Sequence, residues 1–553
     1  MADKKPKRPS VKVDQSQWTG YFINPHPLPC SHQPGEAIKD RHDELVQKVR
    51  FMIRDCTSNE EKLLQGMKIV DALERLGVGY HFEEDITMFM DVLSSAKPVR
   101  DNDLFTFALQ FRLLRQHRYD VTCEVFKNFM DENGSFNWDT LRSNADAHAL
   151  LSLYEAAQLG KRDESSLRGA MVFTTECLSS LANSGLLPEP VLERVRHSLA
   201  SPTHRRMKRL EAKLYISIYE NSDGDSRDDR DDVLELAKLD FHILQQMHRD
   251  EVKSFSLWYN DLNPAKTLSG PIRERPVECY FWALGIFYEP HYAKARMAFA
   301  RFVKMFSLFD DTFDSYGTLD ELHRFNQAVQ SWDVEGAKQV GKCYGYVMSH
   351  LSETLEELEA NAGASPAGVH RAKEAIKEAS KCMLQEVIWR EMGQVPPLHD
   401  YLSVSAVTTF YWPLACISFL GMDASDGIFT GAIPFPDKII ESAAIACRLI
   451  DDISGHECEK ERSKCITAVD CYVREHGVTV QEAKRELSTL VDEQWKIMNQ
   501  EFLGNHLVPT PLLMRVMNFE RLMESMYKGV DGYTHPEQIA GQIDKLLNEC
   551  VYH

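Results

Sequence analysis

Two clusters of acidic residues could hold a cation, and each follows an apolar stretch. Asp310, Asp311 and Asp314 lie in the segment Phe-Ser-Leu-Phe-Asp-Asp-Thr-Phe-Asp-Ser-Tyr. Residues four apart share a helix face, so Asp310 and Asp314 would project together. Two carboxylates about 6 Å apart repel by roughly 3 kcal/mol at an effective dielectric constant near 20. In this aromatic setting the pair needs a cation or a shared proton, and oxygen ligands with open positions suit Mg²⁺.

The second cluster follows the apolar run 443–450 and contains Asp451, Asp452, Glu457 and Glu459. On a helix, Asp451 and Glu459 lie two turns apart on one face, with Gly455 between them. Either cluster alone could be an ordinary acidic helix end at the surface. Because each cluster directly follows an apolar helical stretch, the sequence favours one metal site that both clusters share.

Composition limits the partners that such a site could serve. The net charge is −20, from 83 acidic and 63 basic residues, which disfavours nucleic acid or an anionic membrane as the main partner. Thirteen cysteines include no Cys-x-x-Cys pair, which favours reduced thiols in the cytosol. The near-apolar run 410–422 is shorter than the roughly 20 residues of a membrane span. The N-terminal segment has no apolar core and is not a transit peptide, so we expect a soluble, cytoplasmic protein.

Helical periodicity indicates the elements that position these residues. Apolar residues recur at three- and four-residue spacing from Val233, and a capping pair, Thr479 and Glu482, precedes a second such run. No strand-like alternation repeats, so the fold class is all-α. The Asp-rich segment 221–232 is typical of an exposed linker. It predicts a domain of residues 1–225 and a domain of residues 226–553.

A set of motifs runs through nearly the whole chain in a fixed order. They are Arg8-Pro9 with Trp18, Arg273-Glu274-Arg275, Trp282, Asp310 to Asp314, Glu386 with Trp389, Asp400-Tyr401, Thr408 to Tyr411, Arg448 with Asp451, Asp452 and Glu459, and Tyr527 with Asp531-Gly532-Tyr533-Thr534. In this order they resemble the plant class I terpene synthases, specifically the angiosperm sesquiterpene synthases.

The resemblance implies a fold and an activity. The C-terminal domain would be the class I terpenoid synthase α-bundle, and the N-terminal domain a helical, barrel-like, non-catalytic capping domain. The enzyme would ionise and cyclise farnesyl diphosphate, release diphosphate, and act secondarily on geranyl diphosphate. It would use three Mg²⁺ ions, with Mn²⁺ able to substitute, and we expect a monomer.

The resemblance also implies the roles of individual residues. Metal binding would involve Asp310, Asp311, Asp314, Asp451, Gly455 and Glu459, with Asp311 acting beside the metals rather than bridging them. The diphosphate would be bound by Arg273 and Arg448, and Arg275 would orient the loop that closes over the substrate. The aromatic pocket and its loop would comprise Trp282, Phe410, Tyr411, Tyr527, Asp531 and Tyr533.

Three positions depart from the family pattern. Gly455 stands where a Ser or Thr usually supplies a metal ligand, and the side chain of neighbouring Ser454 should point about 100° away on a helix. Asp451 replaces the more frequent Asn. Pro9 stands where monoterpene synthases carry a second Arg, which favours farnesyl diphosphate over the ten-carbon substrate.

Two alternative functions remain, and one further motif match is set aside. A chain-elongating prenyltransferase also uses Mg²⁺ and paired aspartate motifs, although the second motif here is Asp-Asp-Ile-Ser-Gly. An all-α scaffold would use its acidic patches to bind basic partners, and would expose Asp310 and Asp451. Finally, Asp229-Arg230-Asp231-Asp232 matches the D-x-D-D motif of proton-initiated cyclases, but we expect it in a polar linker without an apolar pocket.

Overall fold

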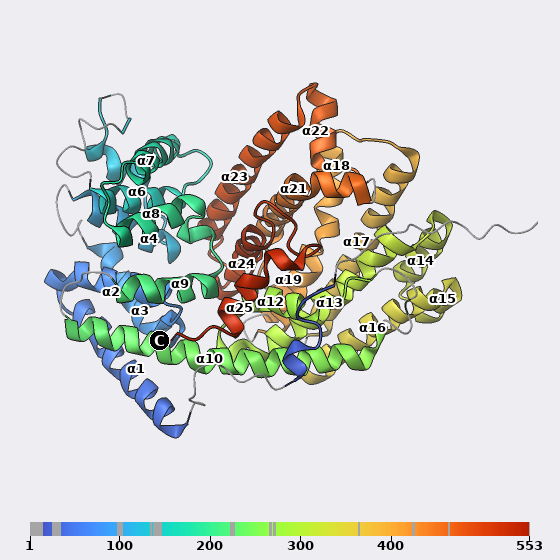
Figure 1. The fold of residues 1–553 in the computed structure, drawn as a ribbon, viewed down its shortest axis with the longest axis horizontal. Helices are drawn as coiled ribbons and strands as arrows, with labels where there is room; N and C mark the ends of the chain where they lie inside the picture. Colours follow the sequence, from blue (N-terminus) through green and yellow to red (C-terminus); the bar gives the residue numbers. More distant parts are fainter. Residues whose placement is uncertain are drawn as a thin grey trace, which may run out of the picture. The chain divides into compact units, whose positions relative to one another are not determined.

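The computed structural model describes residues 15–24, 35–96, 103–132, 135–136, 146–221, 227–264, 268, 272–362, 365–422, 426–462 and 465–551. Within these ranges every regular element is a helix, so the all-α prediction is confirmed (Figure 1). The described chain divides into two compact units, which we call the N-terminal unit and the catalytic unit.

The N-terminal unit comprises residues 28–246, with the short segments 499–506 and 545–553. Its helices are α1 (Glu36–Thr57), α2 (Leu63–Arg75), α3 (Glu83–Ser95), α4 (Leu104–Gln116), α6 (Ala147–Ala157), α7 (Ser165–Asn183), α8 (Glu189–Ala200) and α9 (Lys208–Glu220). The long helix α10 (Arg227–Leu262) begins in this unit and continues beyond residue 246.

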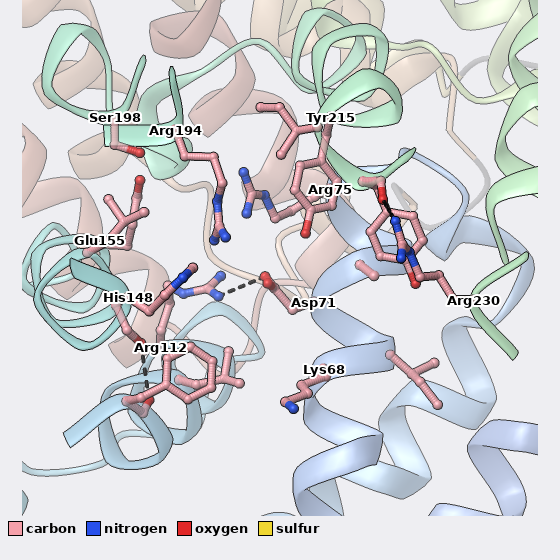
Figure 2. A pocket seen from close by; sticks show the side chains of 18 of the residues that line it. Lys68, Asp71, Arg75, Arg112, His148, Glu155, Arg194, Ser198, Tyr215 and Arg230 are labelled. Carbon is pink, nitrogen blue, oxygen red and sulfur yellow. Dashed lines mark hydrogen bonds and ion pairs between the residues drawn. The ribbon is translucent and has the colours of Figure 1, made fainter. Parts of the chain in front are cut away.

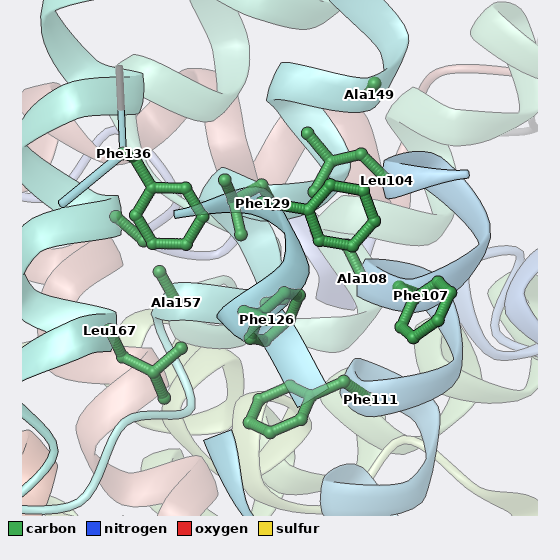
Figure 3. Close-up of a cluster of buried hydrophobic side chains, with 13 residues drawn as sticks. Leu104, Phe107, Ala108, Phe111, Phe126, Phe129, Phe136, Ala149, Ala157 and Leu167 are labelled. Carbon is green, nitrogen blue, oxygen red and sulfur yellow. The ribbon is translucent and has the colours of Figure 1, made fainter. Parts of the chain in front are cut away.

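Aromatic side chains form much of the core of the N-terminal unit (Figure 3). The rings of Phe111 and Phe126 meet edge to face with centroids 5.1 Å apart, and those of Phe107 and Phe129 do so at 5.4 Å. Leu153 on α6 is fully buried in the same cluster. Burying a large aromatic side chain stabilises the fold by about 1.5–3 kcal/mol, which explains how these short helices hold together.

The catalytic unit comprises residues 247–498 and 507–544, with the segment before residue 28. Its helices are α12 (Pro276–Ile286), α13 (Ala293–Asp311), α14 (Leu319–Ser331), α15 (Val334–Val340), α16 (Lys342–Ala362), α17 (Pro366–Met392), α18 (Leu398–Ser405), α19 (Tyr411–Leu420), α20 (Asp426–Phe429), α21 (Asp437–Arg462), α22 (Ala468–His476), α23 (Val480–Gly504), α24 (Thr510–Met526) and α25 (Ala540–Leu547). The C-terminal ends of α23 and α25 belong to the N-terminal unit.

Two short helices lie at the centre of the catalytic unit, as their composition requires. Nearly every residue of α12 and α19 is buried, and a helix that is apolar all round must be surrounded by other helices. Helix α12 packs against α13 and α24, and α19 packs against α13, α17 and α21. The acidic clusters of the sequence lie on α13 and α21, two of the surrounding helices.

Local signals fix where several helices begin. The predicted capping pair is confirmed: Thr479 Oγ1 accepts from the Glu482 N–H at 3.3 Å, and Glu482 accepts from the Thr479 N–H at 2.9 Å. A second capping box, Thr318 with Glu321, starts α14 just after the first aspartate cluster. Gly317 precedes it, where a Cβ would lie 2.5 Å from Leu322 and 2.8 Å from a backbone oxygen. The chain therefore turns tightly after Asp314.

Two sequence predictions need correction. Residues 227–232 belong to α10, so the second half of the Asp-rich segment is helical rather than a linker. Aspartates are favourable in the first turns of a helix, where they face the positive end of the dipole. Residues 222–226 and the predicted boundary at 225 lie outside the described residues. Among the described residues eleven cysteines are free, but Cys550 is disulfide-bonded, so the expectation that the cysteines are reduced is wrong at that position.

One stretch, Leu398–Leu420, is apolar and long enough to cross a membrane by length and composition. It is not one continuous helix, because α18 ends at Ser405 and α19 starts at Tyr411. Two thirds of its most apolar window, 67%, is buried inside the protein. The hydropathy of this stretch is therefore that of a central core segment.

Candidate active site

The first acidic cluster straddles the end of a helix. Asp310 lies in the last turn of α13, and Asp314 lies in the single turn of π-helix, Thr312–Tyr316, that follows. Such turns insert one residue into a helix and are frequent at functional sites. Both carboxylates line one polar cavity of about 170 Å³, so the structure brings them together as the spacing predicts.

Asp311 points elsewhere. Its side chain is 8% exposed, and its two oxygens accept hydrogen bonds from the backbone N–H and the Nε of Arg273 at 3.1 and 2.8 Å. It is absent from the described lining of the polar cavity. Asp311 therefore positions Arg273, whose Nη2 reaches Asp310 at 2.6 Å.

The second cluster lies on α21 and meets the same cavity. Asp451 and Glu459 line it, as does Asp452. Asp452 is already engaged, because its Oδ2 accepts from the Tyr401 hydroxyl at 2.9 Å and from the Ala468 N–H at 2.6 Å. Asp451 and Glu459 are the other two carboxylates that this helix brings to the cavity.

The position of Gly455 is open. A Cβ built there would meet only Glu459 Cγ, at 3.9 Å, so close packing of helices does not require a glycine. Ser454 turns its hydroxyl back to its own helix and donates to the carbonyl oxygens of Ile450 and Asp451. This agrees with the expectation that Ser454 cannot replace the hydroxyl that Gly455 lacks.

Three arginines line the polar cavity. Arg448 is fixed by its Nε to the Ser405 carbonyl at 3.1 Å and by its Nη2 to Thr408 at 3.0 Å, and its Nη1 lies 3.2 Å from Asp451. Arg273 was described above. The third, Arg390 on α17, lies 3.5 Å from Asp314 and was not singled out in the sequence. Its spacing of four from Glu386, which also lines the cavity, is the signal that could have found it.

The carboxylates exceed what these arginines neutralise. Burial, with the neighbouring Asp314, raises the pKa of Asp310 to about 7. Burial likewise raises the pKa of Asp314, of Asp451 and of Glu386, the last to about 8. A site in which carboxylates hold one another's pKa above the ordinary value is one that favours a bound cation. The donor set, carboxylate oxygens from two helices around a small cavity, fits Mg²⁺.

An apolar cavity of about 130 Å³ adjoins the polar one and shares part of its lining, including Arg273, Asp310 and Tyr527. Trp282, Phe306 and Phe410 face it. Phe410 has a left-handed backbone, with φ of 61°, at the break before α19. The ring of Phe410 stacks on the ring of Phe306, with centroids 4.6 Å apart.

Tyr411, which was expected in the same pocket, lines neither cavity. It is buried, and its ring packs on Phe519 of α24 with centroids 5.1 Å apart. The left-handed Phe410 separates the two neighbours, so one ring faces the cavity and the other the core. The structure therefore corrects Tyr411 to a packing residue.

A loop after α24 closes one side of the site. The Oδ1 of Asp531 accepts from the backbone N–H groups of Tyr533 and Thr534 at 2.9 and 3.0 Å. Arg275 is fully buried and donates to the carbonyl oxygens of Tyr533 and Thr534. The ring of Tyr533 meets Trp282 edge to face at 6.0 Å. Arg275 thus holds the loop in place without lining the cavity.

The N-terminal motif is only partly described, because Arg8 and Pro9 lie outside the described residues. Trp18 is 5% exposed and packs with Tyr21 and Phe22. Ser16 donates to Glu278 of α12 at 2.5 Å. This segment is therefore tied to the helix that carries Trp282.

Two family models match the chain. The metal-binding domain of the terpene synthase family matches residues 260–497, and the terpene synthase N-terminal domain matches residues 17–199. Among curated relatives, a (−)-germacrene D synthase of Vitis vinifera is 38% identical and covers 90% of this chain and 88% of its own. An alpha-humulene synthase of Zingiber zerumbet is 36% identical and covers 96% and 94%.

Solved structures agree with these matches. A limonene synthase with 2-fluorolinalyl diphosphate superposes with a TM-score of 0.89 at 25% identity and covers 98% of this chain and 100% of its own. Isoprene synthase from grey poplar leaves, in complex with three Mg²⁺ ions and dimethylallyl-S-thiolodiphosphate, gives a TM-score of 0.82 at 28% identity and covers 93% and 97%.

Proposed function

This chain belongs to the terpene synthase family, and from that premise we propose that it ionises farnesyl diphosphate and cyclises the resulting carbocation to a sesquiterpene. The observation that carries the proposal is the junction of two unlike cavities. One is lined by carboxylates and arginines, the other by aromatic rings, and they share Arg273, Asp310, Arg448, Asp451 and Tyr527. A diphosphate in the first would place its prenyl chain in the second.

The polar cavity suits the leaving group. Asp310, Asp314, Asp451 and Glu459 would hold divalent metal ions, of which we propose three Mg²⁺. When bound, such ions neutralise the diphosphate and so ease cleavage of its C–O bond. The guanidinium groups of this chain complete the binding, because Arg273, Arg390 and Arg448 reach the cavity and can donate two hydrogen bonds each to phosphate oxygens.

The apolar cavity suits the carbocation. Trp282, Phe306 and Phe410 present ring faces and edges, and aromatic faces attract a cation. Val303 and Leu414 add apolar surface to the same cavity. The loop held by Arg275 brings Tyr533 to the same cavity and excludes water there.

The alternatives lose support from particular contacts. A chain-elongating prenyltransferase would present two aspartates from its second motif, whereas Asp452 is engaged by Tyr401 and Ala468. A scaffold that binds basic partners would expose both clusters, whereas the side chains of Asp310 and Asp451 are 30% and 35% exposed within a cavity. Asp229 and Arg230 of the D-x-D-D match line a cavity of the N-terminal unit rather than lying in a linker, but that lining is strongly charged, with six cationic side chains, and Asp229 accepts from Gln65.

Incubation of the purified protein with farnesyl diphosphate and Mg²⁺, followed by gas chromatography and mass spectrometry, tests the proposal. We expect fifteen-carbon products that do not change when isopentenyl diphosphate is added, and slower conversion of geranyl diphosphate. Longer prenyl diphosphates formed only with isopentenyl diphosphate would assign the chain to the transferases instead.

We also propose that the enzyme acts as a monomer in the cytosol. Eleven free cysteines among the described residues favour a reducing compartment, whereas the disulfide bond of Cys550 counts against one. A fluorescent fusion found in plastids, or a dimer in light-scattering measurements, would contradict this.

A further inference from the structure

A further cavity lies in the N-terminal unit, apart from the two catalytic cavities (Figure 2). Its volume is about 560 Å³, against about 130 and 170 Å³ for the two catalytic cavities. Cavities of 300–1,000 Å³ are typical of small-molecule sites. The lining comes from α2, α4, α6, α8, α9 and the start of α10. Gln65 and Lys68 of this lining are exposed, so the cavity reaches the surface.

Charged side chains form much of the lining of this cavity. Six cationic side chains contribute to it, namely Lys68, Arg75, Arg112, Arg194, Arg206 and Arg230. Carboxylates also line it, but most are engaged by neighbouring backbone or hydroxyl groups. Asp146 caps α6 and accepts from the Ala149 N–H at 2.7 Å, and Glu155 accepts from the N–H and hydroxyl of Thr203 at 2.9 and 3.0 Å.

Three arginines converge in the middle of the cavity, as Figure 2 shows for Arg75, Arg112 and Arg194. Two of them have carboxylate partners: Arg112 binds Asp71 at 2.7 Å, and Arg75 binds Glu211 at 2.9 Å while its guanidinium lies 3.7 Å from the Tyr215 ring centroid. These partners hold both guanidinium groups in fixed orientations.

Arg194 differs from them. Its Nε is buried without a hydrogen-bond partner, and among the described residues no carboxylate forms an ion pair with it. Burial is the main cause that lowers the pKa of Arg194, and the neighbouring Arg75 lowers it further. Burial and Arg194 also lower the pKa of His148, which faces the same space. A buried cation beside like charge is costly unless an anion accompanies it.

We propose that this cavity is a second ligand site, which binds a phosphate or diphosphate group between Arg194, Arg75 and Arg112. Guanidinium groups suit phosphate because each can donate two parallel hydrogen bonds. Apolar side chains make up part of the wall, including Ile69, Phe105 and Leu109, so an organic phosphate with an apolar body also fits. Asp71 and Glu155 lie near enough to raise the pKa of Arg194, but neither forms an ion pair with it, and such a ligand would supply that partner.

Calorimetric titration of the full-length protein in EDTA tests the site, because chelation removes the metal that diphosphate needs in the catalytic cavity. The probes are inorganic phosphate, inorganic diphosphate and a farnesyl thiolodiphosphate. We expect saturable binding of diphosphate that Arg194→Gln weakens at least 10-fold and Arg194→Lys weakens less. The matched control is Arg196→Gln, since Arg196 is exposed two residues away on the same helix.

The three probes distinguish the source of the phosphate. Tighter, Arg194-dependent binding of the thiolodiphosphate would indicate an organic phosphate, and equal binding of inorganic diphosphate would indicate the head group alone. Turnover of farnesyl diphosphate with Mg²⁺ should be unchanged in Arg194→Gln, which verifies that the variant is folded. Binding that is absent for all three probes, or equal in wild type, Arg194→Gln and Arg196→Gln, would overturn the proposal.

Discussion

The two units of this protein carry cavities of opposite charge character. In the catalytic unit, carboxylates face one another, and burial raises the pKa of Asp310 and Glu386. In the N-terminal unit, guanidinium groups face one another, and burial lowers the pKa of Arg194. Like charges crowded in a buried space are stable only when a partner of opposite sign joins them. Each cavity therefore indicates its ligand by the charge that it lacks, a metal cation in one and an oxyanion in the other.

The two cavities hold their arginine side chains in the same way. In the catalytic unit, a buried aspartate fixes an arginine: Asp311 binds the backbone and Nε of Arg273. In the N-terminal unit, Glu211 binds both Arg75 and Arg206, at 2.9 and 2.5 Å. In both units a carboxylate thus fixes arginine side chains that line the cavity. The difference between the units is which sign is left facing the cavity.

The largest effect should come from the first aspartate cluster. Asp310→Ala and Asp314→Ala each remove a metal ligand whose loss costs several kcal/mol of transition-state stabilisation, so turnover should fall roughly a thousandfold. Circular dichroism and thermal melting should be near those of wild type, because both side chains face a cavity. Asp320→Asn, an 85% exposed side chain on α14, is the control. A variant that keeps a tenth of wild-type turnover at ordinary Mg²⁺ would remove this cluster from the metal site.

Gly455 offers the next largest effect, and one that separates metal binding from packing. A Cβ there meets only Glu459 Cγ at 3.9 Å, so Gly455→Ser should fit and its hydroxyl can serve as the missing ligand. Gly455→Leu should fill the space beside Glu459 and lower metal affinity and turnover by roughly 100-fold. Both variants should be at least as stable as wild type, since glycine is a poor helix former.

The measurement is the Mg²⁺ concentration that gives half-maximal turnover in the two Gly455 variants. We expect an unchanged or lower requirement for the serine variant. A leucine variant that is active at wild-type Mg²⁺ concentrations would place the third metal away from this helix.

Arg390 should give a smaller effect. Its guanidinium lies 3.5 Å from Asp314 and also donates to the Phe313 carbonyl at 3.3 Å. Loss of one charged donor to the diphosphate should lower kcat/KM by about 10- to 30-fold in Arg390→Gln. Arg371→Gln is the control on the same helix, because Arg371 is exposed and binds the exposed Asp437. Equal kinetics of the two variants would show that Arg390 has no role in the site.

Much of the catalytic site follows from local spacing in the sequence. The spacing of Asp310 with Asp314, and of Asp451 with Glu459, predicts two shared helix faces, and the structure places all four carboxylates at one cavity. The capping pair at Thr479 is equally local and is confirmed. Such patterns are predictable because helix geometry relates residues a few positions apart.

What the sequence did not predict depends on contacts between distant segments or on single backbone angles. The left-handed φ of Phe410 turns Tyr411 into the core, and nothing in the residue types indicates that angle. The π-turn after Asp311 is likewise a matter of local backbone angles. The contact of Arg390 with Asp314 joins two segments that only the fold brings together. The arginine-lined cavity draws on six helices, so no short motif could reveal it.

The smallest effect concerns the stability of the N-terminal unit and has an unusual sign. If Arg194 serves a ligand, then without that ligand its buried charge beside Arg75 works against folding. Arg194→Gln should therefore raise the free energy of unfolding by about 1 kcal/mol or less in phosphate-free buffer. Diphosphate in EDTA should stabilise the wild type more than the variant, because only the wild type gains the full binding energy. Thermal melting with and without diphosphate measures both differences, with Arg196→Gln alongside. A purely structural Arg194 predicts the opposite sign, a loss of stability of 1–3 kcal/mol that is independent of diphosphate, as is usual when a buried polar contact is removed.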